Sequence, residues 1–393
     1  MIYVIYTLAI LSGLMVFATF YLVLLAVIGL LFRQEQPVAR NPYRFLILIP
    51  AHNEGEGIIP TIDSLKNLDE RHESKIVLIA DNCDDNTASL AHETGIEVVE
   101  RNNTSQRGKG YALQWAMEQF DLKDFDAVGI VDADTIVEPN MLETMAGLLA
   151  AGASAVQLNY LFVPVGNKPM SHLQHIASLV ENFLFYKPRA LMNMAGLLRG
   201  SGMAIDTDTL IEHPWDSHSI TEDVDFSVKL LRAGHTIEFT TTSSVYSYAT
   251  TDYDQASTQK SRWASGSFAL IVDHFFPLIF AGLTGKFKLI EFAVSLFLMS
   301  RPLLIYIAGF LALSSWILLG SAALPLVILN LVVAGIIVLY LMSGTFLVPD
   351  RTSAIKAWLH LPRYGIWFLW VQLKSLFRLR RSDWKRTERK PNE

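Results

Sequence analysis

The chain has 393 residues, 51% of them hydrophobic and only 18% charged, and its mean hydropathy is positive, so part of it is expected to lie in lipid. The net charge of −6 argues against a nucleic-acid partner, because such partners require a basic surface. The single cysteine, Cys83, excludes an internal disulfide and the paired spacings of zinc sites, which is compatible with the reducing cytoplasm.

The N-terminal segment, residues 1–33, is predicted to be a transmembrane helix. Residues 2–32 carry no charge, and at about 1.5 Å per residue this run exceeds the hydrocarbon thickness of about 30 Å. A secretory signal would instead show a basic start, a shorter apolar core and a cleavage site of small residues. The other interpretation, a buried core helix, requires an unusually long one.

The middle of the chain, residues 40–270, shows the alternation of strands and helices that is typical of an α/β domain. Short apolar runs that end at Pro or Asp predict buried parallel strands, and helical spacing separates them. The pattern indicates a doubly wound, mostly parallel sheet, in which ligands bind beyond the carboxyl ends of the strands. The predicted strands are residues 45–49, 76–80, 96–99, 127–131 and 155–160, and the predicted helices are residues 56–67, 87–94, 109–120 and 140–150.

Polar and acidic residues follow three of these strands, at the edge where a ligand is expected. Asp and Asn cap helices routinely, but capping alone explains three such turns at one edge poorly. Two carboxylates that flank one small residue can share a hard divalent cation, Mg²⁺ or Mn²⁺, and leave sites for phosphate oxygens. A metal–diphosphate site is therefore predicted. The residues in these turns are Pro50, His52 and Glu54, then Asp81, and then the triplet Asp132-Ala133-Asp134.

A basic turn, Gly108-Lys109-Gly110, lies between the second and third acidic turns. It has neither the G-x-G-x-x-G spacing of dinucleotide folds nor the longer Walker spacing, so both motifs are rejected. Arg107 and Lys109 are candidates for electrostatic contacts to a diphosphate, with a solvated basic turn as the alternative.

A second acidic motif, Thr221-Glu222-Asp223, precedes a helix-like stretch at residues 224–233. One interpretation is an N-cap with acidic residues in the first turn. The functional interpretation makes Asp223 a general base that accepts the proton of an attacking hydroxyl, with Glu222 beside it as a second catalytic candidate. The two interpretations are compatible.

The motif Gln259-Lys260-Ser261-Arg262-Trp263 combines an amide, a guanidinium and a large aromatic face within five residues. On a helix, Gln259 and Trp263 share one side. Arg262 is suited to bind a leaving diphosphate through two hydrogen bonds, and Trp263 is suited to stack on a sugar. The alternative is a membrane-interface tryptophan with a basic neighbour.

The C-terminal third is predicted to return to the membrane. Residues 301–348 form an uncharged stretch after Arg301 that is long enough for a transmembrane hairpin, with a break expected around residues 320–325. Residues 271–300 are expected to form interfacial helices, because the apolar run 292–300 is too short to cross. Residues 349–393 are predicted to be an amphipathic, basic tail on an anionic surface, with a solvated tail as the alternative.

Basic residues indicate the orientation. Cations that follow the first helix and crowd the C-terminus place both flanks in the cytoplasm. Three crossings with the N-terminus outside then put the middle domain and the tail on the inner side, so we expect an integral inner-membrane protein with a cytoplasmic domain. The basic residues are Arg33, Arg40 and Arg44 after the first helix, and Lys374, Arg378, Arg380, Arg381, Lys385, Arg386, Arg389 and Lys390 near the end.

The order of these motifs carries a family resemblance. The chain resembles the membrane-bound family 2 glycosyltransferases, such as the cellulose, chitin and hyaluronan synthases, over residues 44–263. The resemblance implies a glycosyltransferase-A fold, a UDP-sugar donor and inversion at the anomeric carbon. Ala80 departs from the pattern, because the family often has a second aspartate there. The matching motifs are Asp81, Asp132-Ala133-Asp134, Thr221-Glu222-Asp223 and residues 259–263.

The resemblance also implies a role for each matching residue. Asp132 and Asp134 would meet the metal and the diphosphate, and Asp223 would be the base. The loop Gly200-Ser201-Gly202, together with Trp263, would border the acceptor. The donor and its nucleotide would be held by Pro50, His52, Glu54, Asp81, Lys109, Asp132, Gln259, Arg262 and Trp263.

The expected reaction is transfer of a sugar to a growing polysaccharide or a lipid-linked saccharide. The alternatives are single-sugar transfer to a glycolipid, resembling ceramide glucosyltransferase, a sugar nucleotidyltransferase, and a catalytically silent membrane scaffold. Three crossings supply too few helices for an export channel, so a homo-oligomer or a separate export partner is expected.

Overall fold

The computed structural model describes residues 2–376, and within them eight strands form one mixed sheet in the order β3-β2-β1-β4-β7-β6-β8-β5. The strands are β1 Arg44–Ala51, β2 Glu73–Asp81, β3 Glu97–Arg101, β4 Ala127–Ile130, β5 Thr135–Val137, β6 Ala155–Val163, β7 Met203–Asp206 and β8 Ile237–Tyr248. Strands β1 to β4 are parallel to one another. Strand β7 runs antiparallel to β4 and β6, and β8 is parallel to β6 but antiparallel to β5. The α/β prediction is confirmed.

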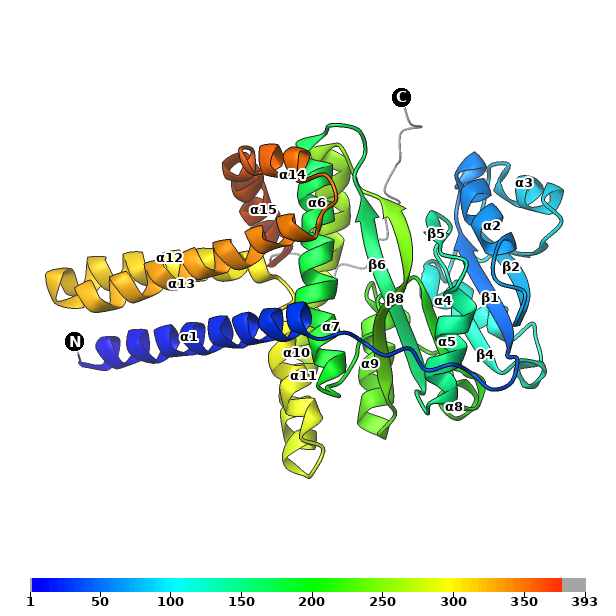
Figure 1. Cartoon of the computed structure of the whole chain (residues 1–393), viewed down its shortest axis with the longest axis horizontal. Helices are drawn as coiled ribbons and strands as arrows, with labels where there is room; N and C mark the ends of the chain where they lie inside the picture. The colour runs from blue at the N-terminus through cyan, green and yellow to red at the C-terminus, as the bar shows by residue number, and fades with distance from the viewer. Residues whose placement is uncertain (1, 377–393) are drawn as a thin grey trace.

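Helices connect the strands and cover the sheet (Figure 1). Two of them are shorter than predicted. The helix expected at residues 56–67 begins as a 3₁₀ turn, Gly55–Ile58. The helix expected at residues 109–120 ends at Met117, and the amides of Gln119 and Phe120 donate hydrogen bonds to carbonyl oxygens three residues back. The helices of this domain are α2 Ile59–Lys66, α3 Thr87–Glu93, α4 Lys109–Met117, α5 Met141–Ala150, α6 Pro169–Glu181, α7 Lys187–Leu191, α8 Thr207–Glu212 and α9 Glu222–Ala233.

The sheet is buried on both faces. Along β1, Leu46 and Leu48 belong to one apolar cluster, whereas Ile47 and Ile49 belong to a second one on the opposite face. A strand that is buried on both sides has a continuous apolar sequence, which is why residues 45–49 could be recognised. The parallel half of the sheet therefore brings the ends of β1, β2 and β4 to one edge, where the acidic turns lie.

Apolar helices extend from one side of this domain (Figure 1). Within residues 2–376, three helical stretches are long and apolar enough to cross a membrane, namely Ile2–Leu31, Tyr253–Leu283 and Arg301–Leu347. The last is a hairpin of α12, Arg301–Leu319, and α13, Leu324–Ser343, and the predicted break lies at Gly320–Ala323. The first is helix α1, which packs on both, and Asn330 of α13 donates a buried hydrogen bond to Ser12 of α1 at 2.8 Å.

Helix α10, Tyr253–Leu283, is continuous through residue 270, where we expected the catalytic domain to end. Figure 1 shows α10 and α11, Lys288–Phe297, running across the direction of α1, α12 and α13. Val272, Phe276 and Phe280 are exposed at four-residue spacing, as on a helix that lies along a membrane surface. The interfacial placement of residues 271–300 stays a prediction.

The beginning of the tail folds back onto α10. Helix α14, Arg351–Trp358, is followed by α15, Leu361–Leu376, and the indole N–H of Trp367 donates to Ser257 at 2.7 Å. Helix α15 is amphipathic as predicted, because Ile366 and Trp370 are exposed whereas Phe368 is buried. Residues 377–393, with Phe377 and most of the predicted basic cluster, lie outside the described residues.

Candidate active site

The nucleotide side of the predicted site is built by the turns after β1 and β2. Asn53, two residues after β1, and Asn82, directly after β2, have left-handed backbones with φ of 56° and 52°. Such conformations are uncommon for residues other than glycine and gather at functional sites. One turn is tied to the other, since Nδ1 of His52 lies 2.7 Å from the carbonyl oxygen of Asp81.

Asp81 is buried, and one of its carboxylate oxygens accepts two hydrogen bonds. Arg101 pairs with it at 2.6 Å, and the amide of Asn82 donates to the same oxygen at 2.9 Å. Pro50 belongs to β1. Glu54 directly precedes the 3₁₀ turn Gly55–Ile58, and its carbonyl oxygen accepts a hydrogen bond from the N–H of Gly57 at 3.1 Å. The predicted nucleotide residues Pro50, His52, Glu54 and Asp81 therefore all lie along the ends of β1 and β2.

Four of the predicted residues converge at the centre of the edge. The ammonium group of Lys109 binds the carboxylate of Asp132 and also donates to the carbonyl oxygen of Gly200 at 2.5 Å. A methyl group added at Gly200 would lie 3.2 Å from Oδ2 of Asp223 and 3.5 Å from the ammonium nitrogen of Lys109. Gly200 has φ of +84°, so glycine is suited to this position both by its backbone and by the space available. The proposed base, the basic turn and the Asp-x-Asp motif thus meet at one point.

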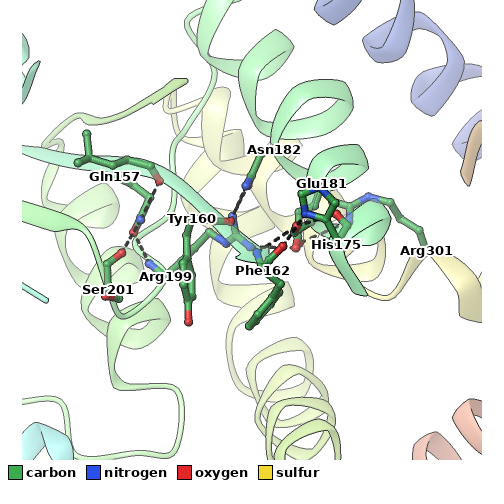
Figure 2. Close-up of polar contacts among 11 residues, drawn as sticks. Gln157, Tyr160, Phe162, His175, Glu181, Asn182, Arg199, Ser201 and Arg301 are labelled. Carbon is green, nitrogen blue, oxygen red and sulfur yellow. Dashed lines mark hydrogen bonds and ion pairs between the residues drawn. The ribbon is translucent and has the colours of Figure 1, made fainter. Parts of the chain in front are cut away.

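Hydrogen bonds to Asp132 and Gln157 hold the loop that is predicted to border the acceptor, Gly200-Ser201-Gly202. The backbone N–H of Asp132 donates to Oγ of Ser201 at 2.9 Å. The buried side chain of Gln157 accepts from the N–H of Arg199 at 2.6 Å and donates to the carbonyl oxygen of Ser201 at 2.9 Å (Figure 2). The loop predicted to border the acceptor and the motif predicted to bind a metal are therefore parts of one hydrogen-bonded unit.

Asp132 and Asp134 fit a hard divalent cation by their chemistry. Both are half-buried carboxylates just beyond β4, and oxygen ligands suit Mg²⁺ and Mn²⁺. Within the described part of the chain, no third histidine, cysteine or carboxylate ligand gathers with these two. Magnesium sites often combine one or two carboxylates with substrate phosphates, so the two residues match a site that a diphosphate completes.

Helix α10 brings the last motif to the same carboxylates. Arg262 interacts electrostatically with Glu222 and Asp132. The ring of Trp263 lies 6.0 Å from that of Phe162 on β6, and the ammonium group of Lys260 sits 4.7 Å from the indole centroid. The side-chain oxygen of Gln259 is buried without a hydrogen-bond partner among the described residues.

A tight contact sets the distance between α10 and α9. A methyl group added at Gly266 of α10 would lie only 2.3 Å from the methyl group of Thr221. Because Thr221 directly precedes the Glu222-Asp223 pair, the helix that carries Arg262 and Trp263 is packed directly on the motif predicted to be catalytic.

Comparison with known proteins decides the class. A family model described as glycosyltransferase-like family 2 matches residues 42–266, which is more than half of the chain and covers every motif above. The chain belongs to glycosyltransferase family 2. It is therefore an enzyme that transfers sugars, and both the predicted family and the predicted glycosyltransferase-A fold are confirmed.

Two curated relatives of this family 2 enzyme are similar over different lengths. The poly-β-1,6-N-acetyl-D-glucosamine synthase of Staphylococcus aureus is 25% identical over 58% of this chain, and the chain spans about half of that relative, 56%. A probable glycosyltransferase of Bacillus subtilis, YdaM, is 22% identical over 87% of this chain and 86% of its own.

Among solved structures, the mannosyltransferase PcManGT of Pyrobaculum calidifontis, in complex with GDP-Man and Mn²⁺, has the same fold. It is 18% identical, with a TM-score of 0.60 over 94% of this chain and 99% of its own.

The two carboxylates predicted to be catalytic in this family 2 enzyme, Glu222 and Asp223, have pKa values that burial raises. Burial and the neighbouring Asp223 raise the pKa of Glu222. Burial also raises the pKa of Asp223 above its usual 3.8, whereas Lys109 and the N–H of Val224, 2.8 Å from Oδ1, oppose that rise. A base with a raised pKa is better matched to proton transfer near neutral pH. Thr221 makes no side-chain capping hydrogen bond to α9.

Several residues at the site were missed by the sequence analysis. Gln157 and Asn159 are buried polar residues in β6, and their presence inside an apolar strand was a signal that could have been used. Arg199 and Glu181 pair at 2.9 Å behind the acceptor loop, but they lie 18 residues apart without any local motif.

Proposed function

We propose that the chain is an inverting glycosyltransferase that moves a sugar from a UDP-sugar onto a growing polysaccharide or a lipid-linked saccharide at the inner membrane face. One observation carries the proposal, namely that Asp223, Lys109 and Asp132 converge at Gly200. A base, a cation and a metal-binding carboxylate around one small loop are what attack on an anomeric carbon requires.

In the proposed reaction Asp223 takes the proton of the acceptor hydroxyl as its oxygen forms a bond to the anomeric carbon. The bond from that carbon to the diphosphate oxygen breaks on the opposite side, which inverts the configuration. A divalent cation on Asp132 and Asp134 would supply charge neutralisation to the diphosphate. Lys109 and Arg262 are the cations of the chain that would share that charge, and Trp263 would stack on the acceptor sugar.

The membrane helices support an acceptor that stays at the bilayer. Basic residues after α1 favour a cytoplasmic catalytic domain, and Arg301 at the start of α12 pairs with Glu181 of that domain at 3.4 Å. The synthase relative forms a polysaccharide according to its name, which favours chain extension. The mannosyltransferase with the same fold was solved with GDP-Man, so GDP-sugars belong in any donor test.

Transfer of a labelled sugar tests the proposal. The detergent-purified protein is incubated with a labelled UDP-sugar, Mg²⁺ or Mn²⁺, and a membrane extract, and the products are separated by size. Labelled polymer or lipid-linked oligosaccharide supports the proposal, whereas one added sugar on a glycolipid favours the alternative that resembles ceramide glucosyltransferase. A sugar nucleotidyltransferase would instead make UDP-sugar from a nucleoside triphosphate and a sugar phosphate.

A further inference from the structure

A buried ionic cluster lies behind the acceptor loop, where no motif predicted one. One carboxylate oxygen of Glu181 accepts a hydrogen bond from Arg199 at 2.9 Å, and the other lies 3.4 Å from Nη1 of Arg301. Arg301 is 5% exposed, and its guanidinium lies 4.1 Å from the ring centroid of Phe185. Figure 2 shows Glu181 beside Arg301.

The cluster holds one carboxylate against three cations. Lys260, from the same motif as Arg262 and Trp263, also interacts electrostatically with Glu181. Burial alone raises the pKa of Glu181, but Arg199, Arg301 and Lys260 together hold that pKa below its usual value. The carboxylate therefore stays charged, and removing its charge would leave three neighbouring cations uncompensated.

Glu181 joins the parts of the molecule that must deliver an acceptor. It ends α6, Arg199 directly precedes the acceptor loop at Gly200, and Arg301 is the first residue of the membrane hairpin. Lys260 adds α10.

The contact continues from Glu181 to the reacting groups. Arg199 donates its backbone N–H to Gln157, and Gln157 donates to the carbonyl oxygen of Ser201 (Figure 2). The hydroxyl oxygen of Ser201 in turn accepts the backbone N–H of Asp132. Gly200 of the same loop lies next to the carboxylate of Asp223 on α9. A shift of Arg199 would thus move the acceptor loop relative to the base.

The helix is irregular at this point. A π-helical turn, Asn182–Tyr186, begins directly after Glu181, and such turns are frequent at functional sites. Adjacent side chains on a regular helix do not face each other, yet Glu181 and Asn182 both contact the guanidinium of Arg199. Asn182 also donates to the carbonyl oxygen of Tyr160 at 2.6 Å, which ties the turn to β6.

We propose that Glu181 is a positioning residue, which fixes the acceptor loop to the membrane hairpin so that an acceptor arriving from the bilayer meets Asp223. The inference rests on the proposed function, because it concerns the acceptor of that same site. It predicts that Glu181 governs transfer to the acceptor and leaves donor binding unchanged. A merely structural ion pair would affect both alike.

The test compares two reactions of the full-length protein in detergent, which are hydrolysis of the donor without acceptor and transfer with a membrane extract as acceptor. Glu181→Gln keeps the shape and removes the charge. We expect donor KM and hydrolysis to stay within about twofold, and transfer to fall about 10- to 100-fold, the size of effect expected when reacting groups are misplaced by about 1 Å. Arg301→Gln should likewise lower transfer and leave donor hydrolysis unchanged. The double variant should lose less transfer activity than the product of the two single fold-losses.

The matched control is Glu143→Gln. Glu143 of α5 also bridges two basic side chains, Arg71 at 3.0 Å and His72 at 2.8 Å, but has no contact with the acceptor loop. The Glu143→Gln variant should change hydrolysis and transfer by the same factor or leave both unchanged.

Unchanged transfer in Glu181→Gln, or an equal loss of hydrolysis and transfer, would overturn the positioning role. A wild-type protein that turns over no donor would instead count against the proposed function.

Discussion

The carboxylate of Asp223 lies beside Gly200 and is hydrogen-bonded within its own helix. Oδ2 of Asp223 faces the empty space at Gly200, while Oδ1 accepts the N–H of Val224 at 2.8 Å. The first-turn hydrogen bond is what an acidic helix start predicts, and the position beside Gly200 is what a base requires. At the scale of the residue, both sequence interpretations of Asp223 are therefore compatible with the structure.

Asp223→Asn should abolish transfer and keep the donor bound. Loss of a general base typically costs about 10²- to 10⁴-fold in rate, while the amide keeps the shape of the side chain. Donor affinity by calorimetry and product formation would be measured together. The control is Asp225→Asn on the same helix turn, since Asp225 pairs with His274 at 2.9 Å and should be close to wild type. Equal activity in both variants would rule out Asp223 as the base.

Transfer activity should fall on the acidic side at a pH above the ordinary pKa of an aspartate. The base works as a carboxylate, and burial raises the pKa of Asp223, so activity should fall as pH drops through that raised value. Because Lys109 lowers the pKa of Asp223, Lys109→Met should move this fall in the residual activity to higher pH. A fall near pH 3.8 in both proteins would contradict this account.

At the scale of the element, the sequence predicted β1, β2, β3, β4 and β6 of the eight described strands and missed β5, β7 and β8. β1, β2 and β4 were predictable because their apolar runs are continuous. β8 was missed because Ser244 and Ser247 face buried partners, Asn159 and Tyr160, instead of apolar neighbours. Such pairings join residues about 85 positions apart, which local spacing does not reveal.

The contact between α10 and α9 gives a test at this scale. Gly266→Ala should push α10 away from Thr221 and lower transfer about 10- to 100-fold, because Arg262 and Trp263 move with the helix. The double variant Gly266→Ala with Thr221→Ser removes the obstructing methyl group and should recover much of the activity. Gly309→Ala, where nothing lies within 4 Å, is the control and should leave transfer unchanged. Failure of the double variant to recover would show that the close approach is not the cause.

At the scale of the whole molecule, charge and apolar length predicted where the membrane helices lie, and the chain's own contacts show how they join the domain. The Glu181–Arg301 pair spans 120 residues of sequence, and the ion pair between Arg189 and Glu291 at 2.8 Å spans about a hundred. Neither belongs to a motif. The site motifs were predictable because each is a short segment with its own chemistry, whereas the connections between segments depend on the fold.

The orientation can be measured with single cysteines. After Cys83→Ser, we expect Ser321→Cys in the hairpin turn to react with an impermeant maleimide on intact cells, since that turn is predicted to lie outside. Glu93→Cys, exposed on α3, should react only after the membrane is opened. Labelling of Glu93→Cys on intact cells would reverse the proposed topology.

Release of nucleoside diphosphate by the purified protein, across UDP-, GDP- and ADP-sugars and with or without Mg²⁺ or Mn²⁺, tests the central claim most directly. We predict turnover of one donor that requires the metal, is abolished by a chelator, and falls to background in Asp132→Asn. Metal-independent turnover, or full activity in Asp132→Asn, would contradict the proposed site, and a folded protein that turns over none of these donors would contradict the proposed function.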